Sequence, residues 1–281
     1  MPTPRVAAIH DLSGFGRCSL TVAIPILSAM GVQCCPMPTA VLSTHTGGFE
    51  GFTFLDLTDE MQKAAAHWKR LNLRFDAVYS GFLGSERQIG IVEEFIAQFK
   101  AEDTLVVVDP VMGDHGRSYQ TYTPAMCAGM ARLALRADVI TPNLTEAAFL
   151  LNIPYEELPS GESGYRATVE RLSLEGKRSV VLTGASLGEG LTGAVCFDSG
   201  TGRTETVQTA FIAHEFHGTG DVFASVLTGA LVKGIALKDA ARQAAEFVCA
   251  CAKRTAAQNL PVREGVDFEP LLGRLTGDGN G

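Results

Sequence analysis

The chain has 281 residues, and the 46% that are hydrophobic allow a sizeable core and exclude general disorder. A formal net charge of −8 without any basic run argues against nucleic acid as a partner. The seven cysteines form no CxxC pair, and we find neither a signal pattern nor a run long enough to cross a bilayer, so we expect a cytoplasmic protein without membrane contact.

Strand and helix patterns alternate along most of the chain. The first expected strand spans 5–9, followed by a glycine-containing loop at 10–17 and an apolar helix from Leu20. Pro25 should kink that helix or move its start, and Gly31 should end it. Further strands are expected at 75–80, 104–108, 138–141, 179–182, 193–198 and 204–209, the last two paired antiparallel, and further helices near 58, 85, 123, 144, 163, 222 and 238. Thr58 is an expected N-cap, and Ser85 with Gln88 an expected capping box.

The segment 33–53 departs from this rhythm. Pro36 and Pro38 interrupt the strand pattern of 33–42, which is therefore at best an edge strand. A polar loop follows, beginning with Ser43-Thr44-His45-Thr46-Gly47-Gly48. We expect this segment to form a small flap over a binding site.

The alternation predicts an α/β fold with a mostly parallel central sheet flanked by helices. No linker or repeat divides the chain, so we expect one domain over residues 1–275 and a disordered tail over 276–281. Ligands of such sheets bind beyond the carboxyl ends of the strands.

The stretch around which the other motifs are arranged is His217-Gly218-Thr219-Gly220-Asp221. Gly218 and Gly220 let the backbone turn sharply before the next helix, whose unpaired N–H groups attract anions, phosphate above all. Asp221 lies in the first turn of that helix. Its carboxylate either complements the helix dipole or accepts a proton from an attacking hydroxyl, and the motif alone leaves both interpretations open.

Polar residues gather at the expected carboxyl ends of the strands: Asp11, Ser80, Asp109, Asp114, Thr141, Asn143 and Thr183. Asp109, Asp114 and Glu146 would repel one another without a cation, which suggests Mg²⁺. Asn143 and Glu146 also have the spacing of an N-cap pair, and the two roles can coexist.

Two phosphate-binding motifs were weighed. No P-loop pattern occurs. A Gly-x-Gly-x-x-Gly at Gly188, Gly190 and Gly193 leads into a strand pattern, whereas a dinucleotide fingerprint would lead into a helix. We therefore interpret it as a hairpin loop.

A helix-start phosphate site, a carboxylate base, a Mg²⁺ site and a flap are the parts needed for phosphoryl transfer to an alcohol. Over about residues 6–269 the chain resembles the pyridoxal (pyridoxamine) kinases of the ribokinase-like superfamily. The matching stretches are Gly81-Phe82-Leu83-Gly84-Ser85, Val108-Asp109-Pro110-Val111-Met112-Gly113-Asp114, Thr141-Pro142-Asn143-Leu144-Thr145-Glu146-Ala147, Leu182-Thr183-Gly184 and Gly218-Thr219-Gly220-Asp221. Gly-Thr-Gly-Asp alone indicates only the superfamily. The Asp-Pro-Val-Met-Gly-Asp stretch and the flap loop narrow the resemblance to vitamin B6 kinases and related pyrimidine kinases.

The resemblance implies a ribokinase-like homodimer that uses ATP and Mg²⁺ to phosphorylate the 5′-hydroxymethyl group of pyridoxal, pyridoxamine or pyridoxine. Asp221 would be the general base, and backbone N–H groups from Gly218 to Gly220 would hold the transferred phosphoryl group. By the same resemblance, the residues that would contact the nucleotide are Asp109, Thr141, Asn143, Glu146, Thr183, Gly184 and Thr219. A K⁺ ion is a further candidate ligand of this part of the site. Mg²⁺ would be held by Asp109, Asp114 and Glu146, and the pyridine ring by Asp11, His45, Thr46 and Phe82.

Two residues depart from the family pattern. Many pyridoxal kinases carry Ser where Asp11 stands and Tyr where Phe82 stands, so the preferred vitamer stays open. A hydroxymethylpyrimidine kinase would use the same machinery with a different ring pocket. A sugar kinase is a weaker alternative, and a non-catalytic binder on the same fold is the alternative from another class.

Overall fold

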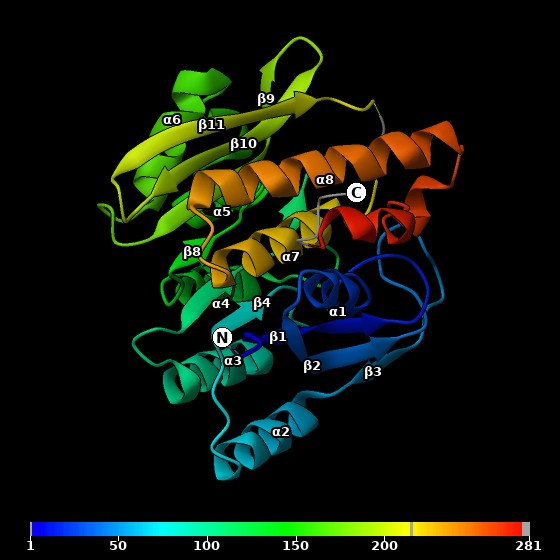
Figure 1. Cartoon of the computed structure of the whole chain (residues 1–281), viewed down its shortest axis with the longest axis vertical. Coiled ribbons are helices and arrows are strands. Elements are labelled where there is room, and N and C mark those ends of the chain that lie inside the picture. Colours follow the sequence, from blue (N-terminus) through cyan, green and yellow to red (C-terminus); the bar gives the residue numbers. More distant parts are fainter. Residues whose placement is uncertain (1, 214–215, 277–281) are drawn as a thin grey trace.

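The computed structural model describes residues 2–213 and 216–276. Within these residues nine strands form one sheet in the order β11-β10-β9-β8-β5-β4-β1-β2-β3, with helices on both faces (Figure 1). Its strands are β1 (Arg5–Ser13), β2 (Gln33–Leu42), β3 (Phe54–Asp56), β4 (Ala77–Ser80), β5 (Leu105–Val108), β8 (Val139–Ile140), β9 (Ser179–Gly188), β10 (Leu191–Asp198) and β11 (Arg203–Ala210). The helices are α1 (Leu20–Ala29), α2 (Thr58–Arg70), α3 (Glu86–Phe99), α4 (Pro124–Ala134), α5 (Leu144–Leu151), α6 (Gly161–Leu172), α7 (Thr219–Val232) and α8 (Leu237–Ala257).

The centre of the sheet is parallel from β2 through β1, β4, β5 and β8 to β9. Both faces of these strands are covered, which is why they are apolar without alternation. The strands β10, β11 and β3 are antiparallel to their neighbours. The predicted mostly parallel sheet flanked by helices is confirmed, as is the antiparallel pair near the C-terminal third.

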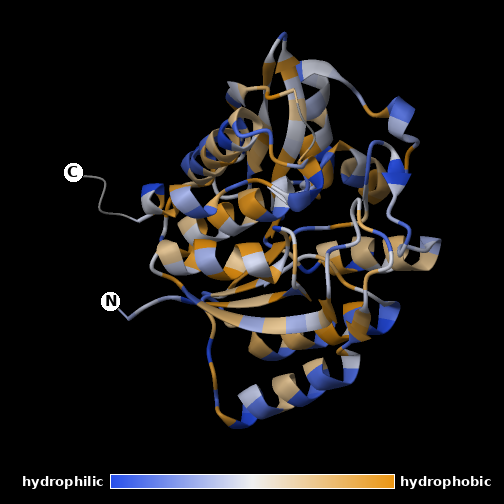
Figure 2. Ribbon diagram, turned by 90° about the vertical axis from the view of Figure 1, so that its right-hand side faces the viewer, coloured by the Kyte–Doolittle hydropathy of each residue, from blue (hydrophilic) through white to orange (hydrophobic). Residues whose placement is uncertain are grey.

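The core has two layers, one on each face of the sheet. Helices α1, α7 and α8 pack on one face and α2 to α6 on the other. In β1, Val6 and Ala8 belong to the first layer, and Ala7 and Ile9 to the second, as the two-residue period of a strand requires. Hydrophobic residues accordingly concentrate between the sheet and the helices (Figure 2).

The strand expected at best at the edge, 33–42, is an inner strand over part of its length. It pairs with β1 throughout, while the unforeseen β3 pairs with its last three residues. Gln33 N–H donates to Pro4 O, so alternate residues face β1 and both Pro36 and Pro38 face outward, where β3 does not reach. The prolines are tolerated because that stretch is locally an edge.

Several expected element boundaries need correction. The strand β1 continues into the expected loop as far as Ser13, and α1 starts where expected and continues through Pro25. Leu57, not Thr58, is the N-cap of α2, and the Thr58 N–H is bonded by the side chain of Asp56. Ser85 does cap α3, but the Gln88 side chain accepts from Gly84 N–H, so the capping box is incomplete.

The remaining segments are short. The glycines at 188 and 190 lie where β9 turns into β10, so the hairpin interpretation of that motif is confirmed. A second small hairpin, β6 (Gly113–Asp114) with β7 (Arg117–Ser118), was not foreseen. Single turns of 3₁₀-helix occur at Tyr155–Glu157 and Val262–Glu264, and a longer one at Glu269–Arg274. The tail expected at 276–281 lies outside the described residues apart from Thr276, and no helix of the described part is long and apolar enough to cross a membrane.

Candidate active site

The rim of the site is formed where the parallel strands end. Asp11 lies near the end of β1, Ser80 ends β4, and Asp109 and Thr141 directly follow β5 and β8. All four are buried. Because the strands are parallel, residues from distant parts of the chain meet at one edge of the sheet.

The start of α7 is open to an anion. Gly218 is its N-cap, with φ of 74°, and a Cβ there would lie 1.9 Å from Arg17 O, so a side chain cannot be accommodated. No side chain among the described residues caps this helix. Its first N–H groups, with the exposed Gly220 between them, are therefore available to bind a phosphate oxygen.

Asp221 lies one turn into α7 and is half-buried. Burial, followed by the negative charge of Asp11, raises the pKa of Asp221 to about 7, against the influence of the Ser19 backbone, which favours the charged form. A pKa near the working pH is what a general base requires, because the group is then both available and basic enough to take a proton.

Asp109 is the second carboxylate at this point of the rim. Burial and the nearby charge of Asp221 raise the pKa of Asp109 to about 8. Two neighbouring carboxylates of this kind are stabilised by a cation between or beside them.

The start of α5 supplies the capping pair anticipated from the sequence. Asn143 Oδ1 accepts from Glu146 N–H at 2.9 Å, and Glu146 Oε2 accepts from Asn143 N–H at 2.9 Å. The other Glu146 oxygen accepts from Met112 N–H at 3.1 Å, and Asn143 Nδ2 donates to Gly113 O at 2.9 Å. Burial, then the Asp109 charge, raises the pKa of Glu146. The capping interpretation is confirmed, and the pair also anchors the hairpin β6–β7.

Asp114 lies on that hairpin and is exposed, with its carboxylate close to His115. The described residues contain no preformed group of three side chains at metal-ligand distances. Mg²⁺ keeps several waters and is usually held by one or two carboxylates and by phosphate oxygens, so a rim of carboxylates beside a phosphate site fits this ion.

The remaining residues expected to meet the nucleotide lie on adjacent elements. Thr183 N–H donates to Pro142 O at 2.9 Å, which joins β9 to the turn between β8 and α5. Gly184 is exposed, with φ of 69°, and a Cβ there would meet nothing within 4 Å. Thr219 is half-buried at the first position of α7.

The flap is attached to the C-terminal part of the chain through His45. His45 Nε2 donates to Arg263 O at 2.7 Å, and its Nδ1 accepts from Gly47 N–H at 3.1 Å, which determines the neutral tautomer. Burial lowers the pKa of His45. The ring lies 4.9 Å from that of Phe49 and 5.3 Å from that of His217. Both ring nitrogens of His45 are thus engaged within the protein.

Of the other residues expected around the ring, Asp11 is the most deeply buried. It is 4% exposed, and its two oxygens accept from Ser19 Oγ at 2.5 Å and Ser13 Oγ at 2.8 Å. Phe82 and Thr46 are half-buried, and the Phe82 ring lies 5.9 Å from that of Tyr122.

Sequence reasoning missed Ser13, Ser19 and Arg263, which belong to no motif. It also gave no role to His217, whose position next to Gly218 was a usable signal.

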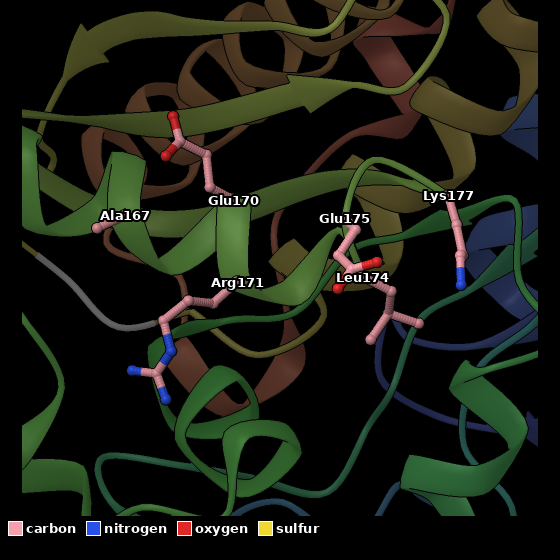
Figure 3. Close-up of a pocket in the computed structure, with 6 residues that line it drawn as sticks. All are labelled: Ala167, Glu170, Arg171, Leu174, Glu175 and Lys177. Carbon is pink, nitrogen blue, oxygen red and sulfur yellow. The ribbon is translucent and has the colours of Figure 1, made fainter.

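A shallow hollow of about 720 Å³ lies elsewhere, where α6 ends and leads into β9 (Figure 3). This hollow lies near the amino end of β9, whereas the predicted site lies at the carboxyl ends of the strands. None of the predicted site residues lines it.

Known proteins resemble this chain over most of its length. The model of the family described as phosphomethylpyrimidine kinase matches residues 24–266. A solved Bacteroides thetaiotaomicron protein assigned to the phosphomethylpyrimidine kinases is 44% identical, with a TM-score of 0.93 over 98% of this chain and 94% of that one. The same protein has been solved with pyridoxal.

Two further relatives are pyridoxal kinases by name. The pyridoxal kinase of Lactobacillus plantarum is 31% identical, with a TM-score of 0.88 over 98% of this chain and 97% of that one. The pyridoxine/pyridoxal/pyridoxamine kinase of Bordetella pertussis is 29% identical over 89% of both chains. A probable chloroplastic thiamine biosynthetic bifunctional enzyme of Oryza sativa is 25% identical over 88% of this chain. The chain spans only 44% of the length of that relative.

Proposed function

The chain belongs to the family of phosphomethylpyrimidine and pyridoxal kinases, in the ribokinase-like superfamily, and from this premise we propose that it transfers the γ-phosphoryl group of ATP to the hydroxymethyl group of a vitamin B6 vitamer. The observation that carries the proposal is the position of the Asp221 carboxylate in the first turn of a helix whose start has no side-chain cap. Burial raises the pKa of this carboxylate to about 7, which suits a general base.

In the proposed reaction each part of the site has one task. Asp221 accepts the proton of the substrate hydroxyl as the oxygen attacks the γ-phosphorus, the bond from that phosphorus to the bridging oxygen breaks, and ADP leaves. The backbone N–H groups from Gly218 to Gly220 stabilise the negative charge that develops on the transferred group, an arrangement that requires no reorganisation during the reaction. Mg²⁺, held beside Asp109, Asp114 and Glu146, would neutralise phosphate charge and align the nucleotide.

The substrate assignment draws on the relatives. A pyridoxal-bound structure exists for the 44% identical protein, and the Bordetella relative is named for all three vitamers. We propose that Phe82, Thr46 and the flap surround the pyridine ring. The nucleotide would lie along Thr141, Asn143, Thr183, Gly184 and Thr219. A cytoplasmic homodimer, with K⁺ as a further ligand of the nucleotide site, completes the proposal.

The description of the family model names phosphomethylpyrimidine, which supports a pyrimidine as the second candidate substrate. The pyrimidine that the sequence resemblance leaves open is hydroxymethylpyrimidine. One experiment separates the candidates: ATP consumption measured with pyridoxal, pyridoxamine, pyridoxine and hydroxymethylpyrimidine side by side. We expect the highest kcat/KM with a B6 vitamer. A higher value with hydroxymethylpyrimidine would establish the alternative, and ATP binding without turnover of any of the four would indicate a non-catalytic binder.

A further inference from the structure

A single turn of 3₁₀-helix near the C-terminus, Val262–Glu264, joins three other segments of the chain. Its first carbonyl oxygen accepts from the backbone N–H of His217, just before the N-cap of α7, at 3.4 Å. The middle carbonyl oxygen accepts from His45 Nε2, in the flap, at 2.7 Å. The third accepts from the backbone N–H of Arg17, in the loop after β1, at 3.1 Å. Segments that lie far apart in the sequence are therefore held by three consecutive residues.

Glycines allow these segments to pack at backbone distance. A Cβ on Gly218 or on Gly265 would lie 1.9 or 2.8 Å from Arg17 O. A Cβ on Gly47, in the flap, would lie 2.8 Å from the ring of His217. Atoms packed this closely leave little room for one segment to move without displacing its neighbours.

The turn is fastened to the last turn of α8 through Asp267. The N–H of Asp267 donates to Thr255 Oγ1 at 2.8 Å, and one carboxylate oxygen accepts from Arg254 Nε at 2.6 Å. The other oxygen pairs with Arg17 at 3.1 Å, and Arg17 also pairs with Glu269 at 2.8 Å. Figure 1 shows the C-terminal segment beside α1 and the end of β1. Because the side chain of Asp267 is only 10% exposed, solvent screens these pairs little.

Opening of the flap at His45 disturbs this arrangement. Movement of that loop away from the site breaks the bond from His45 Nε2 to Arg263 O. The two neighbouring carbonyl oxygens belong to the same single turn, so a change in its position also reaches Arg17 and His217. Since Arg17 O lies against Gly218, the change continues to the N–H groups at the start of α7.

We propose that the turn Val262–Glu264 couples closure of the flap to the position of the phosphate-binding start of α7, with Asp267 and Arg17 as the positioning residues that hold the turn in place. The inference rests on the proposed function in taking the flap as the cover of the site and the start of α7 as its phosphate site. It gives the C-terminal segment a part in assembling the site.

The test measures hydrogen exchange of the flap amides, residue by residue by NMR, after a change outside the flap. Asp267→Asn removes the negative charge that Arg17 and Arg254 share, and no hydrogen bond or ion pair among the described residues joins Asp267 to the flap. We expect exchange across 43–51 to become about fivefold faster, because a turn that is less firmly placed weakens the His45 bond. Exchange across α3 should stay unchanged, which excludes a general loss of stability.

The matched control is Glu93→Gln. Glu93 also forms a two-bond pair with an arginine, Arg132, at 2.9 and 3.2 Å, and its side chain is 17% exposed. This pair joins α3 to α4 on the other face of the sheet. The change should therefore leave flap exchange at the wild-type rate.

A double-mutant cycle shows whether the effect passes through the His45 bond. In His45→Ala that bond is absent, so adding Asp267→Asn should accelerate flap exchange by less than about twofold further. In the reverse direction, His45→Ala should accelerate exchange of the Arg17 and His217 amides, because coupling is reciprocal. Unchanged flap exchange in Asp267→Asn, a full second acceleration in the double variant, or an unchanged His217 amide in His45→Ala would each overturn the proposal.

A second variant keeps the test decisive if Asp267→Asn does not fold. Arg17→Gln removes the guanidinium and leaves Asp267 paired with Arg254, and the same pattern of exchange is expected from it.

Kinetics provide an independent readout. A misplaced start of α7 stabilises the transferred group less well, so kcat of Asp267→Asn should fall about tenfold while KM for ATP and for the vitamer changes less than about threefold. Glu93→Gln should keep wild-type values. A normal kcat together with fast flap exchange would limit the turn to holding the flap and overturn its coupling to α7. Because exchange needs no turnover, a protein inactive on every vitamer would refute the proposed function, while the exchange of the flap and His217 amides would still decide the coupling.

Discussion

At the scale of single residues, the proposed chemistry depends on the raised pKa of Asp221. Burial and the Asp11 charge both penalise the ionised form, and together they outweigh the favourable influence of the Ser19 backbone on it. The consequence is a carboxylate that titrates near neutral pH, where an exposed aspartate would be fully ionised.

The first prediction concerns turnover. Asp221→Asn preserves the size of the side chain and removes the proton acceptor, so kcat should fall by about 10²–10⁴-fold while ATP binding persists. Turnover and melting temperature should be measured on the same samples. If Asp221 only complements the dipole of α7, the same change would leave turnover near normal and cost about 0.3–1 kcal/mol of stability.

The second prediction concerns stability and pH. The pKa of Asp221 is about 7 in the folded chain and about 4 when unfolded, so the folded state binds the proton more tightly. This group therefore makes folding less favourable as pH rises from about 4 to about 7. An asparagine side chain is uncharged at every pH, as a protonated aspartate is. The melting temperature of Asp221→Asn, relative to wild type, should accordingly be higher at pH 8 than at pH 5, and an equal difference at both values would contradict the raised pKa.

At the scale of elements, the flap is where the site can open. Sequence composition predicts a loop that orders only with ligand, whereas the His45 bonds to Arg263 and Gly47 already attach it to the C-terminal segment. Gly16 and Gly47 let it approach closely, because a Cβ on either would lie within 3 Å of a histidine ring.

The third prediction tests this attachment. In His45→Ala, hydrogen exchange of amides across 43–51 should become faster, because the bonds that hold the loop are removed. ATP with substrate should slow exchange across 40–52 in the wild type. The control is His67→Ala, which changes an exposed histidine in the last turn of α2. Unchanged exchange in His45→Ala would show that other contacts hold the flap.

The fourth prediction concerns the hairpin β6–β7 and the metal. Asp114 is exposed and makes no bond that supports the core, so Asp114→Asn should leave stability unchanged and raise the Mg²⁺ concentration needed for half-maximal activity. Asp239→Asn, in the exposed first turn of α8, is the control. Full activity of the wild type in excess chelator would exclude a divalent ion from the reaction.

At the scale of the whole molecule, one edge of the sheet exposes apolar side chains. Val41, Phe54 and Leu55 on β2 and β3 are 37%, 42% and 60% exposed. Edge strands with exposed apolar residues pair or aggregate unless they are covered. We therefore expect a second copy of the chain to cover this edge.

The fifth prediction follows from that edge. Sedimentation should show a dimer for the wild type and a monomer for Leu55→Glu, because a buried charge without a partner opposes association. Leu135→Glu changes a leucine of similar exposure, 59%, at the end of α4 and should remain dimeric. A monomeric wild type would refute the expectation that a second copy of the chain covers this edge.

Several features of this protein could be predicted from local patterns in its sequence. The strand and helix segments, the α7 start with Asp221 and the Asn143–Glu146 cap all depend on residues a few positions apart, where periodicity and capping rules apply. The same is true of the hairpin at Gly188. These features were predicted because the interactions that define them are short-range.

Only the tertiary structure decided which distant residues meet. Arg17 and Glu269 are 252 positions apart, His45 and Arg263 are 218 apart, and no local rule relates either pair. Asp11, expected at the substrate ring, accepts hydrogen bonds from the hydroxyls of Ser13 and Ser19, because β1 continues beyond its predicted end and brings these residues together. The sequence alone thus identified the catalytic candidate, whereas the contacts of the residues around it follow from the path of the chain, which depends on packing between segments far apart.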